Sequence, residues 1–240
     1  MAFSLFGAVA LTQNPCADLE SGVEAEVQRL PMAKDDVGVF RAIGDRAVDA
    51  LRQCPQSGRL WYLAARSAEV LEVRSNGQAF ATSGGLNKIV ADALSHAPSS
   101  AAVATVAARV EGRSSLARKA LALDPSYQPA RRALAETLAK EGAVDEALRV
   151  ATVDARRGPM HLTRARVLLA AKRPADAAQE ARKIVPSQPD ELSPAGDLYR
   201  DGQEVLGFAL LDLHRPAEAR KALQAAASAG SVAAQRQLAK

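Results

Sequence analysis

Histidine is the side chain most often used as a general base, and the sequence contains three. His96 lies near the predicted end of one helix, His161 at the predicted start of another, and His214 in a predicted turn. No GxSxG, HExxH, SxxK or paired-cysteine motif accompanies them. We interpret the histidines as surface or capping residues. The sequence therefore predicts a protein that is not an enzyme, with no catalytic residue, no metal ligands and no cofactor.

Pairs of adjacent carboxylates are a second possible source of acid–base chemistry. Three such pairs lie at predicted helix starts, at Asp35-Asp36, Asp145-Glu146 and Asp190-Glu191. The positive end of the helix dipole stabilises negative charge at this position. Helix capping therefore explains the three pairs without a catalytic role.

The two cysteines flank a predicted helical hairpin. Cys16 follows Asn14-Pro15, which is typical of a helix start, and Cys54 precedes Pro55, which ends the next helix. In an antiparallel hairpin the two positions differ by about one helical turn, close enough for a disulfide. The alternative is a pair of reduced, buried thiols, as in a cytosolic protein. We predict a Cys16–Cys54 disulfide.

The elements that position these residues are predicted to be helices. The 240-residue chain is 48% apolar and 24% charged, so it can bury a core. Aromatic residues make up only 4%, and β-branched runs are few, which disfavours a large sheet and predicts an all-α fold. The net charge is +4, and basic and acidic residues are interleaved, so we expect no nucleic-acid partner.

Residues 1–14 are predicted to form a separate, apolar and signal-like segment. Ala8-Val9-Ala10 matches an A-x-A cleavage site, although no Lys or Arg precedes the apolar run. The pattern favours export to the periplasm or the exterior over a cytoplasmic location. The alternative is an apolar segment that packs on the first helices. No apolar run reaches the roughly 18 residues of a membrane span.

Residues 15–240 show an internal repeat. Pro125 and Pro159 lie 34 residues apart and enclose a predicted helical hairpin with its turn at Glu141-Gly142. Small residues recur in pairs twelve positions apart, across each hairpin turn, where two helices must approach closely. These pairs are Ala135 with Ala147, Ala165 with Ala177, and Gly207 with Ala219.

The prolines and the apolar periodicity predict six helical hairpins and a last single helix. The predicted ranges are 15–54, 58–96, 99–124, 127–157, 159–186, 196–228 and 231–239. Residues 75–85 and 186–196 are predicted to be longer loops. The helix after Asp35-Asp36 is predicted to bury Val37, Phe40, Ile43, Val48 and Leu51.

These residues resemble the tetratricopeptide repeat, a two-helix unit of 34 residues. The copy starting at Gln128 matches the family at six positions, Leu134, Ala135, Leu138, Gly142, Ala147 and Pro159. A second copy carries Trp61, Ala64-Ala65 and Ala68, and a third carries Gly207, Leu210, Ala219 and Leu223, with His214 in place of the turn glycine. The resemblance implies a right-handed α-solenoid of stacked hairpins whose C-terminal helix caps the stack.

The resemblance also implies function, because first helices of this family line a concave groove that binds peptides or proteins. The groove positions in this sequence include Arg59, Tyr62, Arg66, Thr105, Arg109, Arg132, Glu136, Leu162, Arg166, Glu204 and Phe208. Three arginines, Arg66, Arg109 and Arg166, occupy the same position in different repeats. We expect them to form a stripe that binds carboxylates of an acidic partner.

Other readings of the same residues are open. Arginines on alanine-rich helices also favour helix formation and solubility without binding anything. Two alternatives to a free-standing scaffold are an accessory or regulatory subunit of an enzyme complex and a helical repeat that binds nucleic acid.

Overall fold

The computed structural model describes residues 15–30, 36–75, 85–152, 158–184 and 197–240. These residues form helices and turns, with no strand among them. The helices are α1 (Pro15–Val27), α2 (Asp36–Leu51), α3 (Gly58–Arg74), α4 (Gly85–His96), α5 (Ala101–Glu111), α6 (Ser114–Leu123), α7 (Gln128–Lys140), α8 (Val144–Val150), α9 (Gly158–Ala170), α10 (Pro174–Ala181), α11 (Asp197–Asp212), α12 (Pro216–Ser228) and α13 (Val232–Leu238). The all-α prediction is confirmed, and each predicted hairpin contains two of these helices.

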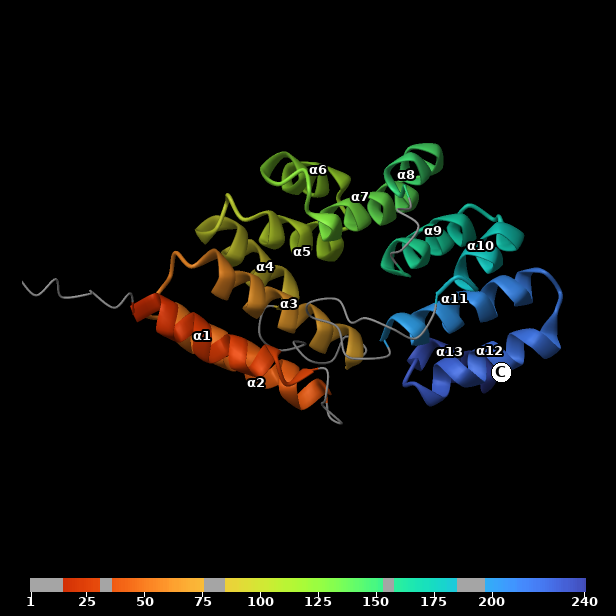
Figure 1. Ribbon diagram of the computed structural model, residues 1–240, viewed down its shortest axis with the longest axis horizontal. Coiled ribbons are helices and arrows are strands. Elements are labelled where there is room, and N and C mark those ends of the chain that lie inside the picture. The colour runs from red at the N-terminus through yellow and green to blue at the C-terminus, as the bar shows by residue number, and fades with distance from the viewer. Residues whose placement is uncertain (1–14, 31–35, 76–84, 153–157, 185–196) are drawn as a thin grey trace, which may run out of the picture.

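The helices stack in two layers along a curved path. Each helix contacts the next one in the chain, and α3, α5, α7, α9 and α11 also contact one another in succession. These five helices lie toward the centre of the arc in Figure 1, with α6, α8, α10 and α12 on its outside. We call the five the inner layer. No described helix has the length and apolarity that crossing a bilayer requires.

Small residues allow the helices to approach closely, as the twelve-residue spacing predicts. Ala135, Ala147, Ala165 and Ala177 are completely buried. Gly207 on α11 lies so near α12 that an added Cβ would be 2.6 Å from Cγ of Leu223. Because Leu223 is itself buried, it has little room to move away.

The turns within the hairpins use left-handed backbone. Gly142 has a φ of 84°, while Lys172 and His214 adopt 58° and 56° without being glycine. His214 thus takes the conformation of the turn glycine that it replaces in the repeat pattern. The turn therefore keeps its left-handed backbone although histidine replaces glycine there.

The first hairpin is linked covalently. Cys16 at the start of α1 and Cys54 after α2 form a disulfide, with their Cα atoms 5.7 Å apart. On α2, Phe40, Ile43 and Leu51 are buried as predicted. The prediction for Val48 is wrong, because this residue is 49% exposed and Ala47 is buried in its place. The segment 1–14, residues 76–84 of the predicted loop 75–85, and the predicted loop 186–196 lie outside the described residues.

Gly207→Ala is expected to lower the free energy of unfolding. Overpacking a buried contact costs about 1–3 kcal/mol, which exceeds the gain in helix propensity of up to about 1 kcal/mol. Gly22→Ala is the matched control, since an added Cβ on α1 would have nothing within 4 Å, and this change is expected to stabilise the protein. Urea unfolding followed by circular dichroism measures both. Equal effects of the two substitutions would contradict the close contact.

Closing the 38-residue separation between Cys16 and Cys54 is expected to stabilise the protein by about 4 kcal/mol. Replacing both cysteines by serine should lower the unfolding midpoint accordingly. Mass spectrometry after alkylation without reductant tests the pairing itself in protein from its native compartment. Two alkylated thiols would refute the disulfide.

Candidate functional site

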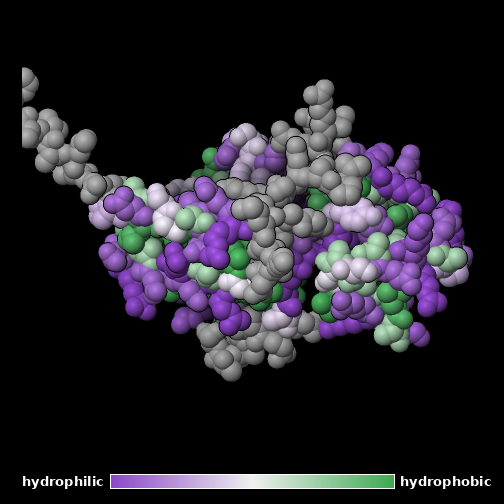
Figure 2. Space-filling view, turned by 60° about the horizontal axis from the view of Figure 1, so that its bottom comes forward, coloured by the Kyte–Doolittle hydropathy of each residue, from purple (hydrophilic) through white to green (hydrophobic). Residues whose placement is uncertain are grey.

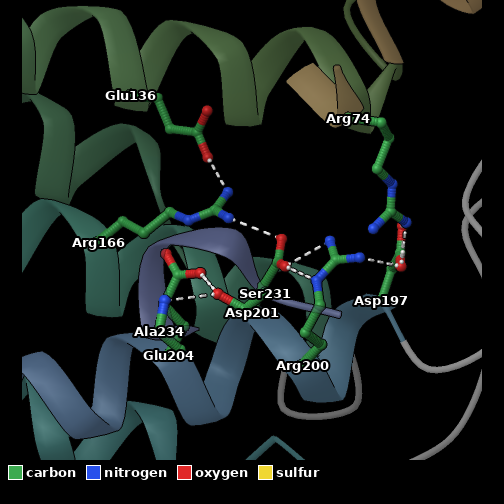
Figure 3. Close-up of polar contacts among 9 residues, drawn as sticks. All are labelled: Arg74, Glu136, Arg166, Asp197, Arg200, Asp201, Glu204, Ser231 and Ala234. Carbon is green, nitrogen blue, oxygen red and sulfur yellow. Dashed lines mark hydrogen bonds and ion pairs between the residues drawn. The ribbon is translucent and has the colours of Figure 1, made fainter. Parts of the chain in front are cut away.

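The inner layer carries charged side chains that alternate in sign from helix to helix. We call this set the inner-face ring, and it comprises Arg66, Glu69 and Arg74 on α3, Arg109 on α5, Glu136 on α7, Arg166 on α9, and Asp197, Arg200 and Asp201 on α11. Each successive inner helix contributes to it. Figure 3 shows its part between α7 and α3, where the side chains point toward one another.

The first section of the ring is a bidentate ion pair between α3 and α5. Nε and Nη2 of Arg109 donate to the two carboxylate oxygens of Glu69, at 2.7 and 2.8 Å. Nη1 of Arg66 donates to Oε2 of the same carboxylate at 2.8 Å. Glu69 is 9% exposed, so three charge-assisted hydrogen bonds hold one buried carboxylate.

The electrostatics of this pair follow from burial and charge together. Burial disfavours the charged form of Glu69, but Arg109 and Arg66 outweigh it and lower the pKa of that carboxyl to about 2. Burial would likewise lower the pKa of Arg109, yet Glu69 raises it above the ordinary arginine value. Both groups therefore stay charged throughout the physiological pH range.

The second section of the ring runs from α7 to α11. Arg166 donates from Nη1 to Glu136 at 3.3 Å and from Nη2 to Asp201 at 2.8 Å. Although burial opposes it, these carboxylates raise the pKa of Arg166. Arg200 then donates to Asp201 at 2.8 Å. One guanidinium thus joins three neighbouring inner helices, α7, α9 and α11.

The last section returns from α11 to α3. Arg200 donates to Oδ1 of Asp197 at 2.5 Å. Nη2 of Arg74, at the end of α3, lies 2.8 and 3.1 Å from the two carboxylate oxygens of Asp197. The two residues are 123 positions apart in the sequence. The ring therefore closes across the arc (Figure 3).

A pocket of about 660 Å³ lies where α3 and α5 begin. It is lined by Gln56, Gly58, Arg59, Tyr62, His96, Ala97, Pro98, Ser99, Ser100 and Ala102. The lining includes a guanidinium, an imidazole and three hydroxyl groups, but no carboxylate. This composition suits a ligand with an acidic group.

Contacts on either side hold the pocket in shape. The guanidinium carbon of Arg59 lies 5.3 Å from the centre of the Tyr62 ring, and Arg59 forms an ion pair with Glu24 of α1. Trp61 stacks on His96 with ring centres 4.9 Å apart. The indole N–H of Trp61 donates to the carbonyl of Pro55 at 2.7 Å. Side chains of α1, α3 and α4 thus fix the rim.

The predicted groove residues fall into three groups. Arg59 and Tyr62 line the pocket, and Arg66, Arg109 and Arg166 belong to the ring. Phe208 packs beside the core of α12 and α13, and Arg132 is half-buried. Thr105 and Leu162, which the groove prediction also named, are buried: the hydroxyl of Thr105 is bonded within its own helix, and Leu162 lies in the core.

The burial of Thr105 and Leu162 follows from the contacts of each side chain. Thr105 bonds back to the carbonyl of Ala101, and Leu162 packs with Ile184 and Val205. Repeat position alone therefore does not decide whether a side chain reaches the inner surface. The neighbouring helix also decides it.

The arginine stripe differs from its prediction in one respect. We expected guanidinium groups that await an acidic ligand, but Arg66, Arg109 and Arg166 already hold carboxylates of the chain. The sequence analysis did not identify Glu69, Asp197 or Asp201. The three-residue spacing of Glu69 from Arg66 and of Asp197 from Arg200 is a signal that could have identified two of them, whereas Asp201 directly follows Arg200.

Comparison with solved structures identifies the fold. A crystal structure of PilW, a widely conserved type IV pilus biogenesis factor, matches 94% of this chain and 99% of its own, with a TM-score of 0.59 and 18% identity. A tetratricopeptide repeat protein from Parabacteroides merdae matches 90% of this chain and 88% of its own, with a TM-score of 0.59 and 14% identity. The chain has the tetratricopeptide-repeat fold.

The helix pairing and the turn positions of the tetratricopeptide repeat are thus present in the structure, as the sequence pattern predicts. Searches of protein-family models and of curated proteins give no match. Within the described residues, no group of three or more His, Cys, Asp or Glu side chains is placed to hold a metal ion.

Glu69→Gln is expected to destabilise the protein by about 3 kcal/mol at pH 7, because it leaves the buried Arg109 without its charged partner. Asp176→Asn is the control, since Asp176 forms an exposed pair with Arg173 and should cost under about 1 kcal/mol. Urea unfolding of both variants measures the difference. Equal losses of unfolding free energy would show that the Glu69–Arg109 pair stabilises the protein no more than an exposed ion pair does.

The pH dependence follows from the lowered pKa of Glu69. A carboxyl that titrates near 4.5 when unfolded and near 2 when folded stabilises the protein above about pH 4.5. This contribution, on the order of 3 kcal/mol, is lost as the pH falls from about 4.5 to 2. Acid unfolding of Glu69→Gln should lack it, and an identical pH profile would contradict the assignment.

Proposed function

We propose that this protein is a non-enzymatic interaction scaffold that binds an acidic peptide or protein segment through the pocket at the start of α3 and α5. The observation that carries the proposal is the pocket lining, which includes Arg59 and His96 and no carboxylate. Helical-repeat folds present such concave surfaces to protein partners. This last step is an analogy at the level of the fold.

The chemistry of the pocket favours a carboxylate. The side chain of Arg59 is 29% exposed, so it is partly desolvated but reachable. A carboxylate side chain or a chain terminus can accept hydrogen bonds from this guanidinium and from the hydroxyls of Ser99 and Ser100. The ring of Tyr62 and the side chains of Ala97 and Ala102 offer apolar contact beside it.

The inner-face ring is less suited to the same ligand. An acidic group that approaches Arg166 has to displace Glu136 or Asp201, and one that approaches Arg109 has to displace Glu69. Each displacement gives up a hydrogen-bonded ion pair and leaves a carboxylate near the incoming negative charge. Arg59 is also paired, with Glu24, but the Glu24 side chain is 33% exposed, compared with 11% for Glu69, 24% for Glu136 and 22% for Asp201, so its displacement costs less. We therefore place the acidic ligand at Arg59, and we assign the ring arginines a structural role.

The same observations bear on the alternatives. A nucleic-acid-binding repeat needs a continuous basic surface, whereas the ring alternates in sign. An accessory subunit of a larger assembly fits the fold equally well and would use the same pocket. We also propose that the protein is exported, because a disulfide between Cys16 and Cys54 suits an oxidising compartment.

Selection from a random peptide library tests the proposal. Wild-type protein is expected to enrich peptides rich in Asp and Glu, or with an acidic C-terminus, and to bind them more weakly as salt is raised. Arg59→Gln should weaken binding about tenfold or more, which corresponds to one charge-assisted hydrogen-bond pair. Arg173→Gln, which removes an exposed arginine on α10, is the matched control.

Two results would contradict the proposal. One is selection of basic or apolar peptides without acidic residues. The other is an equal loss of affinity in Arg59→Gln and Arg173→Gln, because it would show that only net charge matters. Circular dichroism of both variants ensures that binding is compared between folded proteins.

A further inference from the structure

The inner-face ring contains one contact that differs from all its others. The pair of Arg109 with Glu69, and those of Arg166 with Glu136 and Asp201, join helices that already pack against each other in the stack. The pairs that Arg66 and Arg200 form with carboxylates of their own helices lie within α3 and α11. The pair of Arg74 and Asp197 instead joins α3 to α11, which have different packing partners. Helix α3 packs on α1, α2, α4 and α5, and α11 packs on α9, α10, α12 and α13.

The position of this pair follows from the curvature of the stack. The arc runs from α3 through α5, α7 and α9 to α11, and its two ends approach at the C-terminal end of α3 and the N-terminal end of α11 (Figures 1 and 3). Arg74 is the last residue of α3, and Asp197 is the first of α11. A cation at a helix C-terminus and an anion at a helix N-terminus are each favourable with the helix dipole.

The pair is partly shielded from water. The side chains of Arg74 and Asp197 are 19% and 22% exposed, and Arg200, which also holds Asp197, is 13% exposed. Both carboxylate oxygens of Asp197 accept from the guanidinium of Arg74. Such a two-oxygen contact fixes the relative orientation of the two helix ends as well as their distance.

We propose that the Arg74–Asp197 pair is a clasp that holds the two ends of the arc together, and that breaking it opens the superhelix and its inner face. In the clasped form Arg74 and Asp197 bridge the two ends of the arc, so a partner has access to the inner face only from the rims. In the open form α3 and α11 separate, and the hinge is the series of inner-helix contacts between them. This device is independent of the pocket at the other end of α3.

Charge makes the clasp sensitive to conditions. Burial raises the pKa of Asp197, although Arg200 and Arg74 oppose the effect and Asp201 adds to it. Keeping Asp197 ionised is thus costly, and Arg74 supplies part of the compensation. Salt also screens a partly exposed pair, since the Debye length falls from about 30 Å at about 0.01 M to about 3 Å at about 1 M.

Small-angle X-ray scattering on the full chain tests the clasp. Arg74→Gln and Asp197→Asn are each expected to raise the radius of gyration by roughly 1–2 Å above that of the wild type, which as a helical stack should itself exceed the roughly 18 Å of a compact chain of this length. The double variant should expand no further than Arg74→Gln alone, because both changes break one contact. Wild type should expand toward the same value as salt rises, and Arg74→Gln should not respond.

Controls separate opening from unfolding and from a change of net charge. Arg173→Gln removes an exposed arginine and should leave the radius of gyration unchanged. Arg74→Lys keeps the charge but not the two-oxygen geometry, so it should give an intermediate radius of gyration. This variant replaces Arg74→Gln in the test if circular dichroism shows that Arg74→Gln loses helicity. An unchanged radius in folded Arg74→Gln or Arg74→Lys overturns the proposal, as does an equal expansion in Arg173→Gln.

Discussion

A charged side chain that is partly shielded from water is stable only when opposite charges hold it, and the inner layer of this protein is organised around that requirement. Arg109 is held by Glu69 from the preceding inner helix, and Arg166 by Glu136 and Asp201 from the helices on both sides. Each pair therefore fixes the spacing of two repeats. A helix in the wrong register would leave one of these charges shielded from water without its partner. The pairs therefore favour the observed register of the stack, and they also stabilise it.

The charge pairs depend in turn on the small residues of the core. Alanines such as Ala135 and Ala165 are completely buried, and Gly207 leaves no room for even a methyl group. Small contacts bring helix axes toward the short end of the usual 8–10 Å range. Only at such distances do Arg and Glu side chains on neighbouring helices meet. Packing and electrostatics in this protein therefore follow from the same alanine-rich pattern.

The sequence was informative wherever the relevant contact is local or repeated. Prolines and apolar periodicity predicted every hairpin, and the repeat pattern placed His214 at the position of the turn glycine, where the structure has left-handed backbone. Val48 was predicted to lie on the buried face of its helix with Phe40, Ile43 and Leu51. The structure buries Ala47 instead, since a helix contact this close accepts a methyl group more readily than an isopropyl group.

The site was predictable only in part, for a geometric reason. Repeat positions place arginines on successive inner helices, but they do not show which carboxylate from the next repeat will reach them. Asp197 and Arg74 are 123 residues apart, and their contact depends on how far the whole stack curves. That curvature is the sum of many small rotations between repeats, and no local pattern encodes it.

The proposed pocket and the proposed clasp lie at opposite ends of one helix. Arg59 is near the start of α3 and Arg74 is its last residue, so at about 1.5 Å per residue they are roughly 22 Å apart. A group bound at Arg59 therefore cannot touch the clasp, and loss of the clasp removes no group from the pocket. Between them, the ion pair of Glu69 with Arg109 ties the middle of α3 to α5. Because α5 forms part of the pocket rim, this ion pair keeps the rim in place when the C-terminal end of α3 moves. Ligand affinity and opening of the arc can therefore be measured separately.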